Sequence, residues 1–379
     1  MSLGLDKSTW QRVTFGDVVR NVNETLKGAA AGAIDRVIAM EHMDPGELKI
    51  ERWGDIADGT TFTRRVRPRQ TLFGKRRAYQ RKVAYAEFDA ICSGDIYTFE
   101  ADETRMLGEF LPFLVQSDPF FDHALDTSAG SLSPRTNWRD LADFEFELPP
   151  LDEQKRIADL LWAIERHRLQ LAEMEEAVRS SLDVRLAELW VADSEMQPIS
   201  GIGDCVTGST PSKANASYWN SADVPFYTPS EIEHDTMHAA RQRVSVAGAA
   251  TGRALPEFAV AVACIGGDMG KSAVVREPGI SNQQITSIVG LDEADAYLVQ
   301  CLLAHPLGRQ ALEARETTTI VRKLNKSDLM KVQLPWPAER SVLRRLVTDK
   351  RVAVATLRSE LDSLGRLRSA ALAEVFGGN

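Results

Sequence analysis

Apolar residues recur at alternating steps of three and four positions over two long stretches of the chain. This spacing predicts two long helices that each carry a coiled-coil seam. The first seam contains Ile157, Leu161, Ile164, Leu171, Val178 and Leu182. The second contains Leu343, Val347, Val354, Leu357, Leu361 and Leu364. Charged residues interrupt the first seam at Arg168, Glu175 and Arg185.

Each predicted helix follows a proline-rich entry. Leu148-Pro149-Pro150 precedes the first helix, and Leu334-Pro335-Trp336-Pro337 precedes the second. Proline cannot continue a helix from its interior, and Asp152 and Glu153 suit the positive end of a helix dipole, so we expect the first helix to begin near residue 152. Because the entry and the seam both repeat, the sequence indicates an internal duplication.

The duplication divides the chain into four segments. We predict an α+β protein with globular α/β domains at residues 1–150 and 196–336 and long helices at 151–195 and 337–379. A chain of 379 residues is long enough for such a division. A helix of about 38 residues would be about 57 Å long.

Charge is distributed unevenly within a chain whose net charge is −9. Residues 151–195 hold 6 basic and 11 acidic residues, whereas residues 337–379 hold 8 basic and 5 acidic residues. Opposite charge favours side-by-side pairing of the two helices. We expect the acidic outer face of the first helix, with Glu173, Glu175 and Glu176, to contact partner proteins.

Other compositional features indicate the class of protein. No run of eighteen apolar residues and no N-terminal signal pattern is present, so we expect a cytoplasmic protein without membrane association. The four cysteines are far apart and form no Cys-x-x-Cys pair, which predicts buried, reduced thiols.

A basic strip between Arg64 and Lys82 stands out in this acidic chain. Its cations are Arg64, Arg65, Arg67, Arg69, Lys75, Arg76, Arg77, Arg81 and Lys82, with Phe73 and Tyr79 between them. One interpretation is a solvated face of a hairpin, and the other is a strand pair that contacts nucleic-acid phosphates. Under the second interpretation, Arg76, Arg77 and Tyr79 lie at the centre of the contact.

Two further features of the first domain follow the strip. The apolar runs at 83–91 and 96–99, separated by the turn Cys92-Ser93-Gly94-Asp95, predict a meander of strands. A small, polar loop then offers Ser131, Ser133 and Arg135 for contacts with a nucleic-acid backbone.

The second domain has its own candidate contacts. Its opening turn carries Ser209, Thr210, Ser212 and Lys213, and Arg322 and Lys323 stand where the first domain has its Ser133-Pro134-Arg135 loop. Asn282, Gln283 and Gln284 are amides of the type that pairs with adenine, although capping and bridging of strands is a serious alternative role. Lys271 belongs to a Gly-Lys-Ser run that lacks the spacing of a phosphate loop, and we keep it only as a candidate phosphate contact.

Catalytic chemistry is not indicated by any motif. His234 and His238 have helical spacing but no third metal ligand, so a surface pair is favoured over zinc. No motif for amino-methyl transfer and no glycine-rich cofactor loop is present. We therefore predict no catalytic residue, no metal ligand and no cofactor on this chain.

Four stretches together resemble the specificity subunit of type I restriction-modification systems, over essentially the whole chain. They are Arg76–Lys82, Phe146–Gln154, Gly208–Ser212 with Tyr218-Trp219, and Ser281–Gln284. The Leu-Pro-Pro-Leu-Asp-Glu-Gln run that enters a long helix is the most specific of them. The second entry departs from the family pattern at Trp336-Pro337-Ala338-Glu339-Arg340.

The resemblance implies a fold and a set of partners. Two target-recognition domains each read half of a bipartite, asymmetric site in double-stranded DNA, and two antiparallel helices hold the domains apart. Partners would be two modification subunits, which bind S-adenosylmethionine, and two restriction subunits, which use ATP and Mg²⁺. The helices would dock the modification subunits.

Two other function classes stay open at this point. The chain could be a DNA-modifying enzyme with an unfamiliar site, in which case it would cleave or methylate DNA alone. It could also be a coiled-coil scaffold that binds only proteins, in which case loss of Arg76 and Arg77 would leave DNA binding unchanged.

Overall fold

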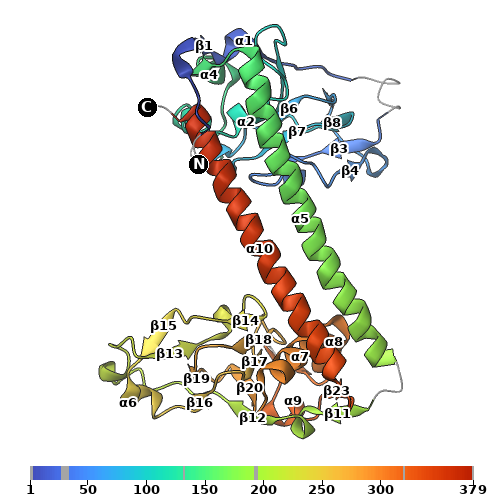
Figure 1. Ribbon diagram of the computed structural model, residues 1–379, viewed down its shortest axis with the longest axis vertical. Coiled ribbons are helices and arrows are strands. Elements are labelled where there is room, and N and C mark those ends of the chain that lie inside the picture. Colours follow the sequence, from blue (N-terminus) through green and yellow to red (C-terminus); the bar gives the residue numbers. More distant parts are fainter. Residues whose placement is uncertain (1–2, 27–33, 131–132, 192–194, 319–320, 378–379) are drawn as a thin grey trace. The chain divides into compact units, whose positions relative to one another are not determined.

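The computed structural model describes residues 3–26, 34–130, 133–191, 195–318 and 321–377 and divides into two compact units (Figure 1). Unit 1 comprises residues 1–171 and 360–379, and unit 2 comprises residues 172–359. The long helices α5 (Leu151–Val191) and α10 (Ser341–Phe376) each contribute to both units. The predicted helix start near residue 152 is confirmed.

The entry of α5 is fixed by a buried amide. The Gln154 side chain donates to the carbonyl oxygens of Pro149 (2.8 Å) and Arg105 (2.9 Å) and accepts from the backbone N–H of Leu107 (2.8 Å). These bonds satisfy backbone groups next to prolines that cannot supply N–H donors. The equivalent residue of the second copy, Arg340, instead pairs with Asp295 at 2.9 Å.

Unit 1 contains two principal sheets. One has the strand order β2 (Val19–Asn21), β9 (Ile96–Ala101), β6 (Thr71–Gly74), β7 (Val83–Tyr85). The other has the order β4 (Gly54–Asp55), β3 (Arg36–Ile38), β8 (Ala90–Cys92), β5 (Arg64–Val66). Strand β1 (Gln11–Thr14) pairs with β10 (Glu145–Leu148) just before α5.

Helices cover the first of these sheets and share its core. They are α1 (Phe15–Val18), α2 (Leu111–Val115), α3 (Asp118–Asp126) and α4 (Trp138–Ala142). Phe73, Phe99 and Phe120 lie in one buried cluster with Leu161 of α5 and Val375 of α10. The two long helices are therefore part of the domain core and are stabilised by burial of their apolar face.

Unit 2 repeats this arrangement. Its sheets have the orders β12 (Asp204–Thr207), β20 (Ile285–Val289), β17 (Val260–Ala263), β18 (Ser272–Val275), β14 (Thr236–Met237), and β15 (Gln242–Val244), β13 (Val224–Tyr227), β19 (Gly279–Ser281), β16 (Ala254–Leu255). Shorter pairs are β11 (Met196–Pro198) with β23 (Gln333–Pro335), and β21 (Thr317–Thr318) with β22 (Arg322–Lys323). The helices are α6 (Val246–Ala249), α7 (Glu293–Ala304), α8 (Pro306–Glu313) and α9 (Lys326–Leu329).

Strand order and sequence offset both show the duplication. The order β2-β9-β6-β7 corresponds to β12-β20-β17-β18, and β4-β3-β8-β5 corresponds to β15-β13-β19-β16. An offset of 189 residues relates the start of β6 at Thr71 to that of β17 at Val260, and the start of β9 at Ile96 to that of β20 at Ile285.

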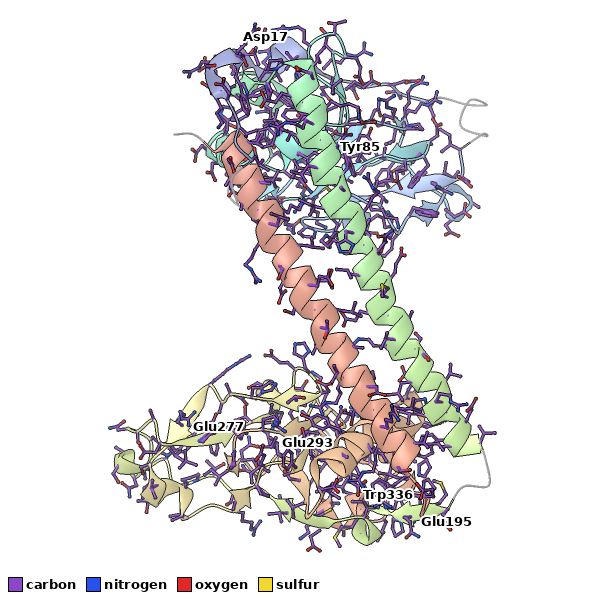
Figure 2. All side chains as sticks on the ribbon, viewed as in Figure 1. Asp17, Tyr85, Glu195, Glu277, Glu293 and Trp336 are labelled. Atoms are coloured by element: carbon purple, nitrogen blue, oxygen red, sulfur yellow. The ribbon has the colours of Figure 1, made fainter. Side chains whose placement is uncertain are left out.

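At the base of unit 2, Glu195 and Trp336 lie together where β11 meets β23, with the backbone N–H of Trp336 donating to the Glu195 carbonyl at 2.8 Å (Figure 2).

The long helices run antiparallel within each unit. In unit 1, Glu165 lies 3.6 Å from Arg368 and His167 lies 3.2 Å from Glu360, so one helix ascends as the other descends. In unit 2, Glu175 lies 3.0 Å from Arg358. The predicted α+β class, with duplicated globular domains and paired long helices, is confirmed.

The predicted seam residues differ in burial. Ile157, Leu161, Ile164, Leu171 and Leu182 of α5 are buried, as are Val347, Val354 and Leu357 of α10. Val178, Leu343, Leu361 and Leu364 are half-buried.

Three predictions about local structure are wrong. The strands after the basic strip form no meander, because β8 belongs to a different sheet from β7 and β9. For the same reason β5 and β6 are not a strand pair. Glu175 is not on the outer face of α5, because Arg179 and Arg358 hold its carboxylate and only 16% of its side chain is exposed.

The cysteines match their prediction. Cys92, Cys205, Cys264 and Cys301 are buried and unpaired. Burial raises the pKa of Cys92 to about 12, which keeps this thiol protonated. No helix in the described ranges is both long and apolar enough to cross a membrane.

Candidate nucleic-acid interface

Three segments of unit 1 meet at one end of its sheets, and we call this group the unit 1 loop cluster. It consists of the β6–β7 loop (75–82), the β8–β9 turn (93–95) and the segment before α4 (133–136). The backbone N–H of Lys75 donates to the backbone carbonyl of Asp95 at 3.0 Å. The backbone N–H of Thr136 donates to the backbone carbonyl of Lys75, also at 3.0 Å. The Arg77 N–H donates to Pro134 at 2.8 Å, so the backbones form one rigid group.

Internal pairs hold Arg76 and Arg135 within this cluster. Asp95 lies 3.4 Å from Arg76 and 3.2 Å from Arg135, and Arg76 also donates to the Ser133 hydroxyl at 2.6 Å. The Lys75 ammonium lies 4.8 Å from the centre of the Tyr97 ring. Burial lowers the pKa of Lys75, with a further contribution from Arg64.

Apart from Arg77, the remaining cations of the basic strip have partners outside the cluster. The ion pairs are Arg65 with Asp89, Arg67 with Glu24, Arg69 with Glu103 and Arg81 with Asp118. Arg64 and Lys82 donate to the carbonyl oxygens of Ile96 and Met40. The strip is therefore distributed over two sheets and does not form a single free basic face.

Arg77 and Tyr79 are the exposed residues of the β6–β7 loop. The Arg77 side chain has no ion-pair or hydrogen-bond partner among the residues that the structure describes. Tyr79 is 56% exposed. Ser131, another candidate, lies outside the described residues.

The corresponding three segments of unit 2 form the unit 2 loop cluster. They are the β17–β18 loop (264–271), the β19–β20 turn (282–284) and the segment 321–324 before α9. The backbone N–H of Cys264 donates to the backbone carbonyl of Gln284 at 2.7 Å. The backbone N–H of Leu324 donates to the backbone carbonyl of Cys264 at 2.8 Å. The Gly266 N–H donates to Arg322 at 3.0 Å, which matches the bond from Arg77 to Pro134.

The predicted amides of unit 2 divide into two groups. The Asn282 amide donates to Gln284 at 2.8 Å, and its oxygen accepts from the Gln284 N–H at 3.0 Å, so these two residues bridge each other. Gln283 is exposed, and its side-chain oxygen accepts from the Thr210 hydroxyl at 2.8 Å. The amide nitrogen of Gln283 has no hydrogen-bond partner among the residues that the structure describes.

A glycine brings the predicted opening turn against these amides. A Cβ atom on Gly208 would lie 2.2 Å from the Asn282 carbonyl oxygen, so only glycine allows this approach. Ser209 and Thr210, which follow it, are half-buried, whereas Ser212 and Lys213 are exposed. The structure therefore places the turn beside Asn282–Gln284, as one surface.

Cations of unit 2 are partly neutralised. Lys271 pairs with Asp268 at 2.5 Å, and Arg322 pairs with Glu313 and Glu316 at 3.1 and 2.8 Å. Lys213 and Lys323 are exposed and have no ion pair within the described ranges. His234 and His238 flank strand β14 and not a helix, and the described residues contain no group of three metal-ligand side chains.

Sequence reasoning did not find Asp95. This residue is the shared acceptor of Arg76 and Arg135, and it occupies the position of Gln284 in the repeat. The offset of 189 residues between β6 and β17 would have revealed it, whereas the seam of the long helices gives a different offset. Arg253, whose guanidinium donates to the Thr207 carbonyl at 2.7 Å, also gave no sequence signal.

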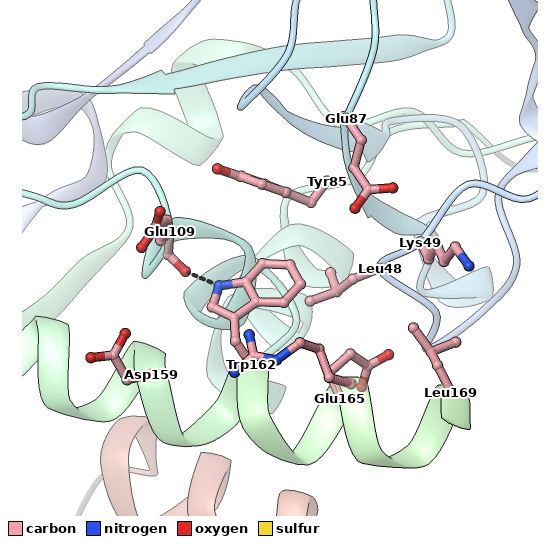
Figure 3. A pocket seen from close by; sticks show the side chains of 10 residues that line it. Leu48, Lys49, Tyr85, Glu87, Glu109, Asp159, Trp162, Glu165 and Leu169 are labelled. Carbon is pink, nitrogen blue, oxygen red and sulfur yellow. Dashed lines mark hydrogen bonds between the residues drawn. The ribbon is translucent and has the colours of Figure 1, made fainter. Parts of the chain in front are cut away.

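Unit 1 also contains a pocket of about 270 Å³ against α5 (Figure 3). Its walls include Leu48, Tyr85 and Trp162, and the Trp162 indole donates to the Glu109 carbonyl at 2.9 Å. The rings of Tyr85 and Trp162 are 5.1 Å apart. The lining of this pocket combines apolar and aromatic side chains with both acidic and basic ones.

Part of the chain matches a described family. Residues 66–177 match the type I restriction modification DNA specificity domain. This range includes the β6–β7 loop, Asp95, Arg135 and more than half of α5.

Curated relatives match over a similar extent. The specificity subunit of type I restriction enzyme HindI from Haemophilus influenzae is 27% identical over 149 residues, which is 38% of this chain and 32% of the relative. The specificity subunit of type I restriction enzyme EcoDI from Escherichia coli is 29% identical over 152 residues, 40% of this chain and 33% of the relative. The matched region thus spans about a third of the length of these relatives.

Solved structures show that the fold extends over the whole chain. A crystal structure of the type I restriction-modification S subunit from M. genitalium has a TM-score of 0.62 at 12% identity and covers 100% of both chains. A structure described as showing complex assembly and conformational transition of the type I system has a TM-score of 0.57 at 18% identity and covers 98% of both chains. The fold is therefore that of a duplicated two-domain protein with paired long helices. The comparisons confirm the resemblance to specificity subunits of type I restriction-modification systems.

Proposed function

We propose that the chain is the DNA sequence-specificity subunit of a type I restriction-modification complex. Each unit reads one half of a bipartite, asymmetric target in double-stranded DNA. The observation that carries this proposal is the duplicated loop cluster, which has the same backbone connections in both units but different side chains at its surface. Equal frames with unequal side chains suit a target whose two halves differ in sequence.

The side chains available in the clusters fit DNA chemistry. Exposed cations neutralise phosphates and orient the domain on the duplex, while donors and acceptors aimed into the major groove distinguish bases. Unit 1 offers the guanidinium of Arg77, and unit 2 offers the amide of Gln283 and the exposed ammonium groups of Lys213 and Lys323. Guanidinium groups pair with guanine and amides pair with adenine in major-groove readout.

The long helices set the spacing between the half-sites in this proposal. Helix α5 has 41 residues, and at 1.5 Å per residue it is about 62 Å long. One turn of B-DNA is about 34 to 36 Å, so helices of this length suit reading at separate turns of one duplex.

The chain supplies specificity and no catalysis. Two modification subunits, with S-adenosylmethionine, dock along the helices, and two restriction subunits supply ATP- and Mg²⁺-dependent cleavage. The α5 pocket with Trp162 and Leu48 supports a docking role for the helix surface of unit 1, because aromatic anchors in partly buried pockets dominate protein interfaces.

Selection of DNA from a random duplex library by the purified full chain tests the reading function. We expect a two-block motif with a fixed gap. A motif of one block would contradict the proposal. A selection that enriches no DNA sequence would also contradict it and would favour the protein-binding scaffold. Methylation or cleavage of the selected DNA by the chain alone, with S-adenosylmethionine or Mg²⁺ added, would favour the enzyme alternative.

A further inference from the structure

Three arginines of the basic strip have a left-handed backbone. Arg69, Arg77 and Arg81 have φ values of 72°, 56° and 51°. At an offset of 189 residues, unit 2 has Phe258, Gly266 and Gly270, with φ values of 62°, 95° and 85°. Both units therefore use the same backbone turn, but unit 1 has arginine at two positions where unit 2 has glycine.

The left-handed conformation is strained for arginine and unstrained for glycine. The Cβ atom of an L-residue approaches the following carbonyl oxygen in this conformation, and glycine has no such atom. A side chain at a strained backbone position destabilises the loop, so its presence there points to a role other than folding of the loop.

Arg81 has an internal reason for its side chain. Its guanidinium pairs with Asp118 at 2.5 Å and lies 4.5 Å from the centre of the Phe121 ring. It also donates to the Gln116 carbonyl at 3.3 Å. These contacts join the β6–β7 loop to α3 and offset the strain locally.

Arg77 has no such reason. Its side chain is exposed and makes no ion pair or hydrogen bond with any residue that the structure describes. Its backbone, in contrast, is held on both sides, because its N–H donates to Pro134 at 2.8 Å and its carbonyl accepts from Gln80 at 2.8 Å. Its neighbour Arg76 is tied to Ser133 and Asp95.

We propose that Arg77 is the base-reading residue of unit 1 and that its guanidinium pairs with O6 and N7 of a guanine in the major groove. This inference rests on the proposed function. A phosphate contact needs only a positive charge, which an unstrained and flexible side chain supplies. Bidentate pairing with guanine needs a planar fork whose starting direction is fixed, and the braced backbone at Arg77 fixes it.

The repeat supports the same assignment. Gly266 occupies the Arg77 position in unit 2 and presents no side chain, so unit 2 reads by Gln283 from its neighbouring turn. Arg76 and Arg135 act as positioning residues in unit 1, because Asp95 holds both guanidinium groups.

The experiment compares motifs selected from a random duplex library by the full chain and three variants. They are Arg77→Gly, which installs the residue of the other unit, Arg77→Lys, which keeps the charge, and Arg139→Ala, which removes an exposed arginine outside the cluster. We expect Arg77→Gly to unfold at an equal or higher temperature, because the strain is removed. It should lose the preference for one G·C pair in one half-site and leave the other half-site unchanged.

The control variants sharpen the result. Arg77→Lys should fail to restore the guanine preference, and Arg139→Ala should select the wild-type motif. Replacement of the critical guanine by 7-deazaguanine removes N7, one of the two acceptors. It should weaken wild-type binding by less than the about 5- to 150-fold expected for loss of a whole bidentate contact, and should leave Arg77→Gly unaffected.

Two outcomes would overturn the assignment. One is an unchanged guanine preference in Arg77→Gly. The other is a uniform loss of affinity for all sequences with a lower salt dependence, which would identify a phosphate contact. In both cases the wild-type chain still selects a two-block motif, whereas failure of the proposed function would abolish that motif in the wild-type chain itself.

Discussion

Glu165 is a charged residue in the interior of unit 1, with 1% of its side chain exposed. It lies 2.8 Å from Arg168 and 3.6 Å from Arg368, and Arg168 also pairs with Glu47. Burial lowers the pKa of Arg368, while the nearby carboxylate of Glu165 acts in the opposite direction. This buried cluster joins α5, α10 and the loop before Leu48, so each charge depends on the others for its stability.

Neutralising Glu165 tests the cluster. The Glu165→Gln variant leaves two half-buried arginines with one remaining carboxylate, and we expect a loss of about 3 kcal/mol in the free energy of unfolding. Urea unfolding followed by tryptophan fluorescence gives this value. Asp362→Asn, an exposed change on α10, is the control and should alter stability by less than about 0.5 kcal/mol. Equal stability of the two variants would show that the cluster contributes nothing.

The residue scale also shows what sequence reasoning cannot reach. The basic strip is recognisable from its composition, and its sequence predicts Arg76, Arg77 and Tyr79 at the centre of the contact. Its internal pairing was not predictable, because acceptors such as Glu24, Asp89 and Asp118 come from distant segments that only the fold brings together. Composition shows how many cations are present, whereas exposure after pairing determines which of them can contact a ligand.

At the scale of elements, a polar position in the seam specifies how α5 and α10 pair in unit 2. Burial by itself would raise the pKa of Glu175, but hydrogen bonds from Arg179 and the charge of Arg358 outweigh it, so the pKa of this carboxyl is lowered. A carboxylate with a lowered pKa stabilises the folded state above its ordinary pKa, and that contribution is lost as pH falls through the lowered value.

The pH dependence of a Glu175 variant follows from this sign. Glu175→Gln should reduce stability at neutral pH by about 1 to 2 kcal/mol, because a charge-assisted hydrogen-bond network is lost. The difference from the wild-type chain should shrink as pH falls well below 4.5, the ordinary value for glutamate. Thermal unfolding across this pH range measures it, and a difference that stays constant with pH would exclude the ion pairs as its source.

Helix length tests the spacing role of the elements. Insertion of one matched heptad after Leu171 in α5 and before Glu360 in α10 preserves both seams and lengthens each helix by about 10 Å. We expect the gap between the selected half-sites to grow by about three base pairs, since one turn of about 34 Å contains about ten base pairs. Library selection reads the gap directly, and an unchanged gap would contradict the spacing role.

The helices were predictable from sequence because their signals are local. The prolines before each helix and its regularly spaced apolar seam lie within one stretch of chain. A buried apolar seam also determines which face of the helix packs against the rest of the protein. The sheets were less predictable, because the short apolar runs at β7, β8 and β9 carry no record of which partner each strand selects. The parallel pairing of β3 with β8 joins residues about fifty positions apart, which no local pattern encodes.

At the scale of the whole molecule, duplication is the organising feature. One strand order, one loop cluster and one helix entry occur twice, and the two copies carry different side chains at the loop clusters and entries. At equivalent positions of the repeat, unit 1 has Arg77, Asp95 and Gln154, and unit 2 has Gly266, Gln284 and Arg340. This pattern suits a protein whose two units perform the same task on two different sequences.

The most direct test maps N6-methyladenine in the DNA of cells that contain a modification subunit with or without this chain. We expect methylation at a single two-block, asymmetric motif that appears only when the chain is present and changes in one block with Arg77→Gly. Methylation that is the same without the chain, or that follows a motif of one block, would contradict it.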